Sequence, residues 1–140
     1  MIRLDSVAAE LLVRAEIPGR PPTVNTIWKR GVRGVYKNPS AAAWQMMAKR
    51  ALIDAKSKYR IKKPCKGWFC VEVLIYTKGE LTAFDADNHI KGAQDCLAYA
   101  GIIEDDKYVL RSCGTKMETK GPTRTVIEVW KVPEKLEGEK

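Results

Sequence analysis

The acidic residues of this basic chain are concentrated in two short segments that could together bind a metal ion. In chain order they are Asp85, Asp87, Asp95, Asp105 and Asp106. Carboxylates repel one another, and they also repel the phosphates of nucleic acids. A divalent cation held between the carboxylates and a phosphate would offset both repulsions. The clustering therefore points to metal-dependent cleavage of a phosphodiester backbone.

The charge of the chain changes sign along its length. The 140 residues carry a formal net charge of +8. Residues 14–66 contain fourteen Lys and Arg and only two acids, whereas residues 67–106 contain eight acids and only two lysines. The basic region could displace counterions from DNA phosphates, or it could be an ordinary solvated surface. The residues that we expect to contact DNA are Arg20, Lys29, Arg30, Arg33, Lys37, Lys62 and Lys63.

The element that must position the first acidic segment is a helix predicted over residues 85–100. Asp87, Lys91 and Asp95 are four residues apart, so they share one face of this helix. Its buried stripe is expected to consist of Ile90, Ala93 and Leu97. Gly101 would end the helix. The short apolar run that follows would return the chain and bring the second acidic segment toward the first.

The remaining pattern predicts a single domain over residues 1–140, with frayed ends at 1–10 and 133–140. Strands are expected over 11–17, 68–76, 108–117 and 123–132, and helices over 41–58 and 85–100. Ser40 is the expected N-cap of the first helix, and residues 23–38 are expected to form a loop. The order β-α-β-α-β-β indicates an α/β (α+β) fold in which two helices pack on one mixed sheet.

The cysteines and the single histidine do not form a zinc site. The four cysteines lack the close pairs that structural zinc requires. Cys70 and Cys96 lie in apolar runs and are expected to be core thiols. His89 is expected on an exposed or half-buried helix face. We expect no secretory signal at the N-terminus and no membrane span, and therefore a reduced, cytoplasmic setting.

Each acidic residue also has a purely structural explanation. Asp85 could cap the second helix, and Asp87 could interact favourably with the helix dipole. Lys91 and Asp95 could form a surface ion pair worth only about 0.3–0.5 kcal/mol. The two acids at 105–106 could simply form a turn. None of these explanations accounts for the gathering of acids in a basic chain.

Two segments resemble motifs of the RusA family of Holliday junction resolvases. The run Asp85-Ala86-Asp87-Asn88-His89-Ile90-Lys91, with Asp95, Gly101 and Asp105-Asp106 behind it, resembles the family pattern DxDN…K…D…DD. The segment Ile17-Pro18-Gly19-Arg20-Pro21-Pro22-Thr23-Val24-Asn25 resembles the family's N-terminal (I/L)PxxPPSxN motif, with threonine in place of serine. The likeness spans roughly residues 17–132. Residues 77–84 are less basic than in the best-known member.

The resemblance implies Mg²⁺-dependent nicking of four-way DNA junctions by a homodimer, often encoded in prophages, with Mn²⁺ as an alternative ion. It implies that the metal-binding catalytic acids are Asp85, Asp87 and Asp106. Lys91 would be the essential lysine, Asp105 a less critical metal-binding neighbour, and Asp95 a supporting residue. A homodimer would supply two matched cuts at a nearly two-fold symmetric junction.

Two other functions stay open at this point. The chain could be an inactive junction-binding protein, although its catalytic positions are intact. It could also be a metal-dependent nuclease or phosphatase that acts on RNA or another phosphate ester. The type of substrate cleaved would separate these alternatives.

Overall fold

The computed structural model describes residues 9–23, 28–31 and 34–132. The strands are β1 (Glu10–Pro18), β2 (Trp28–Gly31), β3 (Gly34–Lys37), β4 (Trp68–Thr77), β5 (Val109–Glu118) and β6 (Arg124–Val132). The helices are α1 (Pro39–Lys58) and α2 (Asp87–Tyr99), with two short 3-10 turns, η2 (Leu81–Ala83) and η3 (Asp106–Tyr108). Within the described residues, no helix is long and apolar enough to span a membrane.

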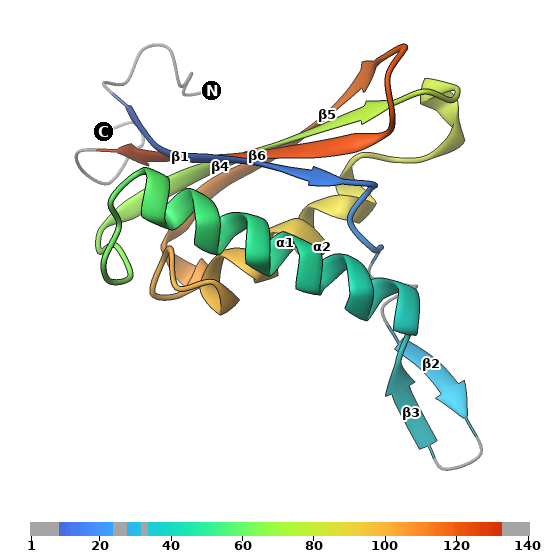
Figure 1. Cartoon of the computed structure of the whole chain (residues 1–140), viewed down its shortest axis with the longest axis horizontal. Coiled ribbons are helices and arrows are strands. Elements are labelled where there is room, and N and C mark those ends of the chain that lie inside the picture. The colour runs from blue at the N-terminus through green and yellow to red at the C-terminus, as the bar shows by residue number, and fades with distance from the viewer. Residues whose placement is uncertain (1–8, 24–27, 32–33, 133–140) are drawn as a thin grey trace, which may run out of the picture.

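The centre of the molecule is a four-stranded mixed sheet of order β1-β6-β4-β5. β4 and β5 are parallel, and the other neighbours are antiparallel. A parallel pair requires a crossover connection, and α2 provides it. Both helices cover the same face of the sheet (Figure 1). The order β-α-β-α-β-β, the mixed sheet and the two helices are confirmed.

The core lies between this sheet and the two helices. Alternate side chains of β4 point to one face, and Phe69, Val71, Val73 and Ile75 are all at most 1 % exposed. They pack in one cluster with apolar residues of α1 and α2, among which are Trp44, Ala48, Leu52, Ala93 and Leu97. Cys70 and Cys96 are both buried, as expected for core thiols. α2 is therefore fixed on the sheet by its apolar stripe, which leaves its acidic face outward.

α1 begins at Pro39, two residues earlier than the expected helix start at residue 41. Asn38, not Ser40, is the N-cap, and its side chain accepts a hydrogen bond from the Ser40 N–H at 3.0 Å. The reason is Pro39, which is well suited to the first helical position because it has no N–H to satisfy. The expected Ser40 cap is therefore wrong.

The expected loop over residues 23–38 contains a β-hairpin instead. β2 and β3 pair antiparallel, from Trp28 opposite Lys37 to Gly31 opposite Gly34. The hairpin projects away from the main sheet next to the start of α1 (Figure 1). Its sequence lacks the alternation of apolar and polar residues that marks a strand packed on a core. A hairpin outside the core does not need that alternation.

The other boundaries agree with expectation to within two residues, apart from an additional short turn, η2, in the loop before α2. Glu10, expected at a frayed end, begins β1. Residues 1–8 and 133–140 lie outside the described residues. Gly101 has a φ of +74°, the left-handed conformation that glycine adopts most easily after a helix. The predicted end of α2 is therefore confirmed.

Candidate acidic active site

The N-terminal end of α2 carries the first two carboxylates. Asp85 and Asp87 are both exposed. The N-cap position is occupied by Ala86, and no side chain caps the helix, so Asp85 does not serve as its cap. Asp87 lies in the first turn, where a negative charge interacts favourably with the helix dipole.

One face of α2 carries charged side chains from its N-terminal end toward its C-terminal end. Lys91 lies one turn after Asp87, and its Nζ is 3.3 Å from Oδ1 of Asp95. The lysine side chain is 61 % exposed, so solvent screens the ion pair and its contribution to stability is small. The three residues share a face as predicted, and Lys91 stays accessible to a ligand.

The second acidic segment forms the turn η3 after α2. Asp105 accepts a hydrogen bond from the Lys107 backbone N–H at 2.9 Å. This bond, with a hydrogen bond to the Asp106 carboxyl and the nearby Lys107 charge, holds the pKa of Asp105 below its ordinary value. Asp105 is therefore ionised at neutral pH. A turn at these positions was one of the expected structural roles, and η3 confirms it.

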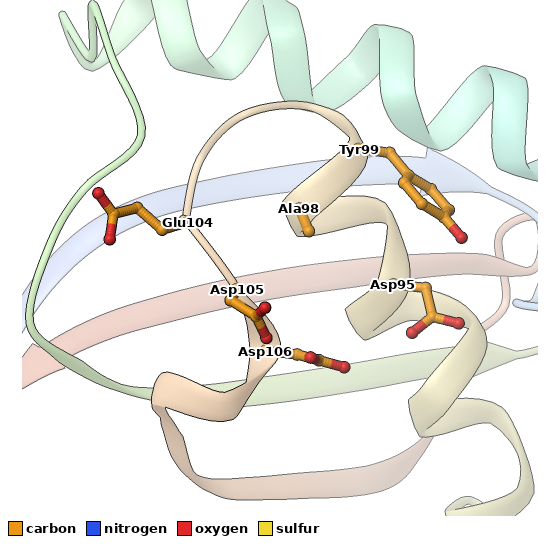
Figure 2. Close-up of a pocket in the computed structure, with 6 residues that line it drawn as sticks. All are labelled: Asp95, Ala98, Tyr99, Glu104, Asp105 and Asp106. Atoms are coloured by element: carbon orange, nitrogen blue, oxygen red, sulfur yellow. The ribbon is translucent and has the colours of Figure 1, made fainter.

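A pocket of about 210 Å³ joins the second segment to α2. It is lined by Asp95, Ala98, Tyr99, Glu104, Asp105 and Asp106. Figure 2 shows Asp106 extending from the turn toward α2 and Asp95 projecting from the helix toward it. Asp105 lies beside Asp106, whereas Glu104 points away. The structure therefore brings Asp95, assigned only a supporting role by the resemblance, next to both predicted acids of this segment.

Asp85 and Asp87 do not line this pocket. Asp87 and Asp95 are eight residues apart on α2, which corresponds to about 12 Å along the helix axis. Among the residues that the structure describes, no group of three or more His, Cys, Asp or Glu side chains could hold one metal ion. The expected gathering of Asp85, Asp87 and Asp106 around one ion is not present in this arrangement.

The carboxylate pairs have the right chemistry for a hard cation. Mg²⁺ is commonly held by one or two carboxylates, and waters and a substrate phosphate complete its coordination. Asp105 and Asp106 at one end, and Asp85 and Asp87 at the other, each offer such oxygens at accessible positions. The donor set therefore fits Mg²⁺ or Mn²⁺ without requiring three carboxylates in contact.

His89 has a structural role that the sequence pattern did not predict. It is only 7 % exposed, not exposed or half-buried. Its Nδ1 donates to the carbonyl oxygen of Pro21 at 2.5 Å, and its ring meets Phe84 edge to face at 5.3 Å. Burial, together with the nearby Arg20 charge, lowers the pKa of His89 although the Pro21 bond raises it. His89 thus fixes the segment before the hairpin to α2.

Gly92 allows this close approach. A Cβ at Gly92 would lie 2.5 Å from the backbone oxygen of Pro22 and 3.3 Å from two of its ring carbons. Real Cβ atoms do not come so near a backbone oxygen, so only glycine fits here. The segment of residues 21–22, called the proline segment below, is therefore packed directly against the backbone of α2.

The predicted DNA contacts are distributed over three regions. Arg20 is exposed and stacks on the Phe84 ring, 4.4 Å from its centroid. Lys62 and Lys63 are exposed in the loop after α1. The backbone of the hairpin places Lys29 and Arg30 on β2 and Lys37 on β3, and Arg33 lies outside the described residues.

Lys116 is a residue that sequence reasoning missed. From β5 it donates to the backbone oxygens of Leu81 at 2.6 Å and Phe84 at 3.0 Å. These two bonds hold the loop that leads directly into Asp85. No motif marks Lys116, because its role depends on a loop 32 and 35 residues away. Asp95, by contrast, was signalled by its helical spacing from Asp87 and Lys91.

Comparison with models of protein families identifies a family for this chain. The model of the family described as endodeoxyribonuclease RusA matches residues 18–130. This range includes both acidic segments, Lys91 and the proline segment. No curated protein is similar enough to the chain to be counted as a relative.

Proposed function

Because the chain belongs to the RusA family of endodeoxyribonucleases, we propose that it is a divalent-metal-dependent nuclease that resolves four-way DNA junctions. The observation that supports this most is the line of carboxylates from the start of α2 to the pocket at η3, in a chain of net charge +8. A basic protein without an anionic substrate has no need of this arrangement.

Two sets of residues would hold divalent cations, which we propose to be Mg²⁺, with Mn²⁺ as an alternative. Asp105 and Asp106 would bind at the pocket end, supported by Asp95, and Asp85 and Asp87 at the other end. When bound, the cation would neutralise phosphate charge and activate water for attack on phosphorus. The short turn η3 supports this role, because it presents the Asp105 and Asp106 carboxylates side by side at the pocket.

Lys91 would bind the scissile phosphate. Its ammonium group lies on the same face of α2 as Asp87 and Asp95, and its ion pair is exposed. Exchange of an exposed carboxylate partner for a DNA phosphate requires little free energy. In the transition state, the same charge would stabilise the additional negative charge on the phosphate oxygens.

The basic residues would contact the arms of the junction through their phosphates and recognise shape more than base sequence. We propose that Arg20, Lys62 and Lys63 act with the hairpin residues Lys29, Arg30, Arg33 and Lys37. A homodimer with two-fold symmetry would present two identical acidic sites and make paired cuts. We expect it to act in the cytoplasm.

The test is cleavage of a mobile four-way junction, with and without Mg²⁺, resolved on a denaturing gel. Linear duplex DNA, single-stranded RNA and a small phosphomonoester serve as comparison substrates. We expect symmetric nicks in the junction that require the metal. Metal-independent binding without nicking would identify an inactive binding protein, and preferred turnover of RNA or the monoester would assign a different hydrolase.

A further inference from the structure

A second pocket, of about 230 Å³, lies at the N-terminal end of α1. It is lined by Arg20, Pro22, Asn38, Ser40, Ala41 and Trp44, and it shares no residue with the acidic pocket. None of these residues is acidic, and the first turn of α1 contains no acid. The positive end of the helix dipole and the Arg20 charge therefore act on this space without a compensating carboxylate among its lining residues.

One residue that lines the pocket, Trp44, carries an unsatisfied donor. Trp44 is 5 % exposed, and its Nε1 has no hydrogen-bond partner among the residues that the structure describes. Leaving a buried N–H unpaired costs about 1–3 kcal/mol, so such groups usually have a partner. The Nε1 edge of the indole faces the chain next to Arg20, because a Cβ at Gly19 would lie 3.4 Å from Cδ1 and 3.7 Å from Nε1. Trp44 Nε1 thus lies beside Gly19, the chain neighbour of the pocket residue Arg20.

Arg20 is held at this pocket by an aromatic ring. Its guanidinium lies over Phe84, 4.4 Å from the ring centroid. In the described part of the chain, no carboxylate forms a salt bridge with it. Stacking occupies the face of a guanidinium and leaves the N–H groups at its edge free to bind an oxyanion. Arg20 is therefore positioned and charged, and its edge is available.

We propose that this pocket binds one phosphate of the DNA backbone. Arg20 provides the charge-assisted donors, Ser40 its hydroxyl, and Trp44 the Nε1–H that is otherwise unpaired. The positive end of α1 adds to the field. This subsite rests on the proposed function, since it supplies a contact for a nuclease that acts on DNA. The alternative explanation for the unpaired Nε1 is a water molecule that bridges it to Oε1 of Gln45, which also has no partner among the described residues.

The first test observes the Trp44 indole directly. The chain has four tryptophans, and Trp44→Phe identifies which indole N–H signal in a ¹H–¹⁵N spectrum is that of Trp44. The protein is titrated with inorganic phosphate and, in a separate arm without Mg²⁺, with an intact four-way junction. We expect a saturable shift of the Trp44 signal in both arms. A Trp44 signal that the junction leaves in place overturns the proposal, whatever free phosphate does.

The second test removes the charge. Arg20→Gln should abolish the Trp44 shift, weaken junction binding about tenfold and reduce the salt dependence of binding by about one phosphate contact. Lys49→Gln is the matched control, because Lys49 is an exposed lysine on the same helix outside the pocket. Equal affinity and salt dependence in the two variants would overturn the proposal. Ser40→Ala, at an exposed position, provides a further variant if Trp44→Phe does not fold.

The outcome is independent of the catalytic assignment. Metal-dependent nicking of the junction by a protein whose Trp44 signal stays in place would leave the nuclease function intact and reject the subsite. A Trp44 shift in a protein that never nicks DNA would support the subsite and reject the nuclease function.

Discussion

The two ends of α2 carry carboxylates in very different surroundings. At the N-terminal end, Asp85 and Asp87 are exposed, and neither lines the pocket at η3. At the C-terminal end, a turn holds Asp105 and Asp106 beside Asp95 around a pocket. The difference teaches that the fold itself gathers the carboxylates at the C-terminal end into a pocket, whereas it leaves those at the N-terminal end exposed to solvent.

Of all the predicted changes, removal of divalent metal should have the largest effect on nicking, and it tests both ends of α2 at once. With EDTA we expect nicking to fall to background, because carboxylates at both ends would then repel the DNA. Mg²⁺ or Mn²⁺ added back should restore nicking. Paramagnetic line broadening by Mn²⁺ in a ¹H–¹⁵N spectrum shows which end of α2 binds the ion more tightly. The signals of residues 105–106 should broaden at a lower Mn²⁺ concentration than those of residues 85–87. Nicking that persists in EDTA would contradict the assignment.

Lys91→Gln tests the charged face of α2, on which Lys91 lies between Asp87 and Asp95. Loss of a cation that stabilises the transition state should lower the nicking rate about 10²–10³-fold. The free energy of unfolding should change by less than about 0.5 kcal/mol, because the ion pair with Asp95 is exposed. Lys120→Gln, an exposed lysine between β5 and β6, is the control. A nicking rate equal to that of the control would remove Lys91 from the mechanism.

Gly92→Ala tests whether the middle of α2 must stay packed against the proline segment. The added methyl group would clash with the Pro22 backbone, and we expect the free energy of unfolding to fall by about 1–3 kcal/mol. Gly79→Ala is the matched control, because a Cβ there would lie 3.8 Å from Oγ1 of Thr77, an ordinary van der Waals distance. Urea unfolding measures both variants. Equal stability of the two would show that the close approach has no consequence.

Asp105→Asn has the smallest expected effect and concerns acid stability. The folded pKa of Asp105 is lowered, so its contribution is present above the ordinary value of 3.8 and is lost as the pH falls through the folded pKa. The parent should therefore lose thermal stability more steeply than the variant below about pH 4. Melting curves between about pH 2 and 6 compare them. Parallel curves would mean that the turn does not stabilise the carboxylate.

The sequence predicted most of the main sheet because its strands are apolar runs bounded by Gly and Pro. It missed the hairpin, which projects away from the main sheet and whose sequence shows no apolar alternation. The cap of α1 was predicted at Ser40, but Pro39 occupies the first helical position and the cap is therefore Asn38. The first error lies where the local sequence pattern gives a weak signal for a strand. The second lies where one neighbouring residue moves the boundary of a helix.

For the site, residue types and the shared helix face were predictable, because helical spacing is local. The burial of His89 was not, since its partner Pro21 is 68 positions away in the chain. The place of Asp95 in the pocket depends on how residues 100–108 return to α2, which tertiary packing decides. Whether Asp85 and Asp87 act with Asp106 stays a prediction.

The most direct measurement is a double-mutant comparison of nicking by Asp87→Asn, Asp106→Asn and the protein carrying both, with junction binding measured in parallel. If the two ends of α2 serve one reaction, each single variant loses nicking by at least about 10³-fold, binding is retained, and the double variant is no slower than the singles. Turnover by either single variant at the rate of the parent would contradict the account.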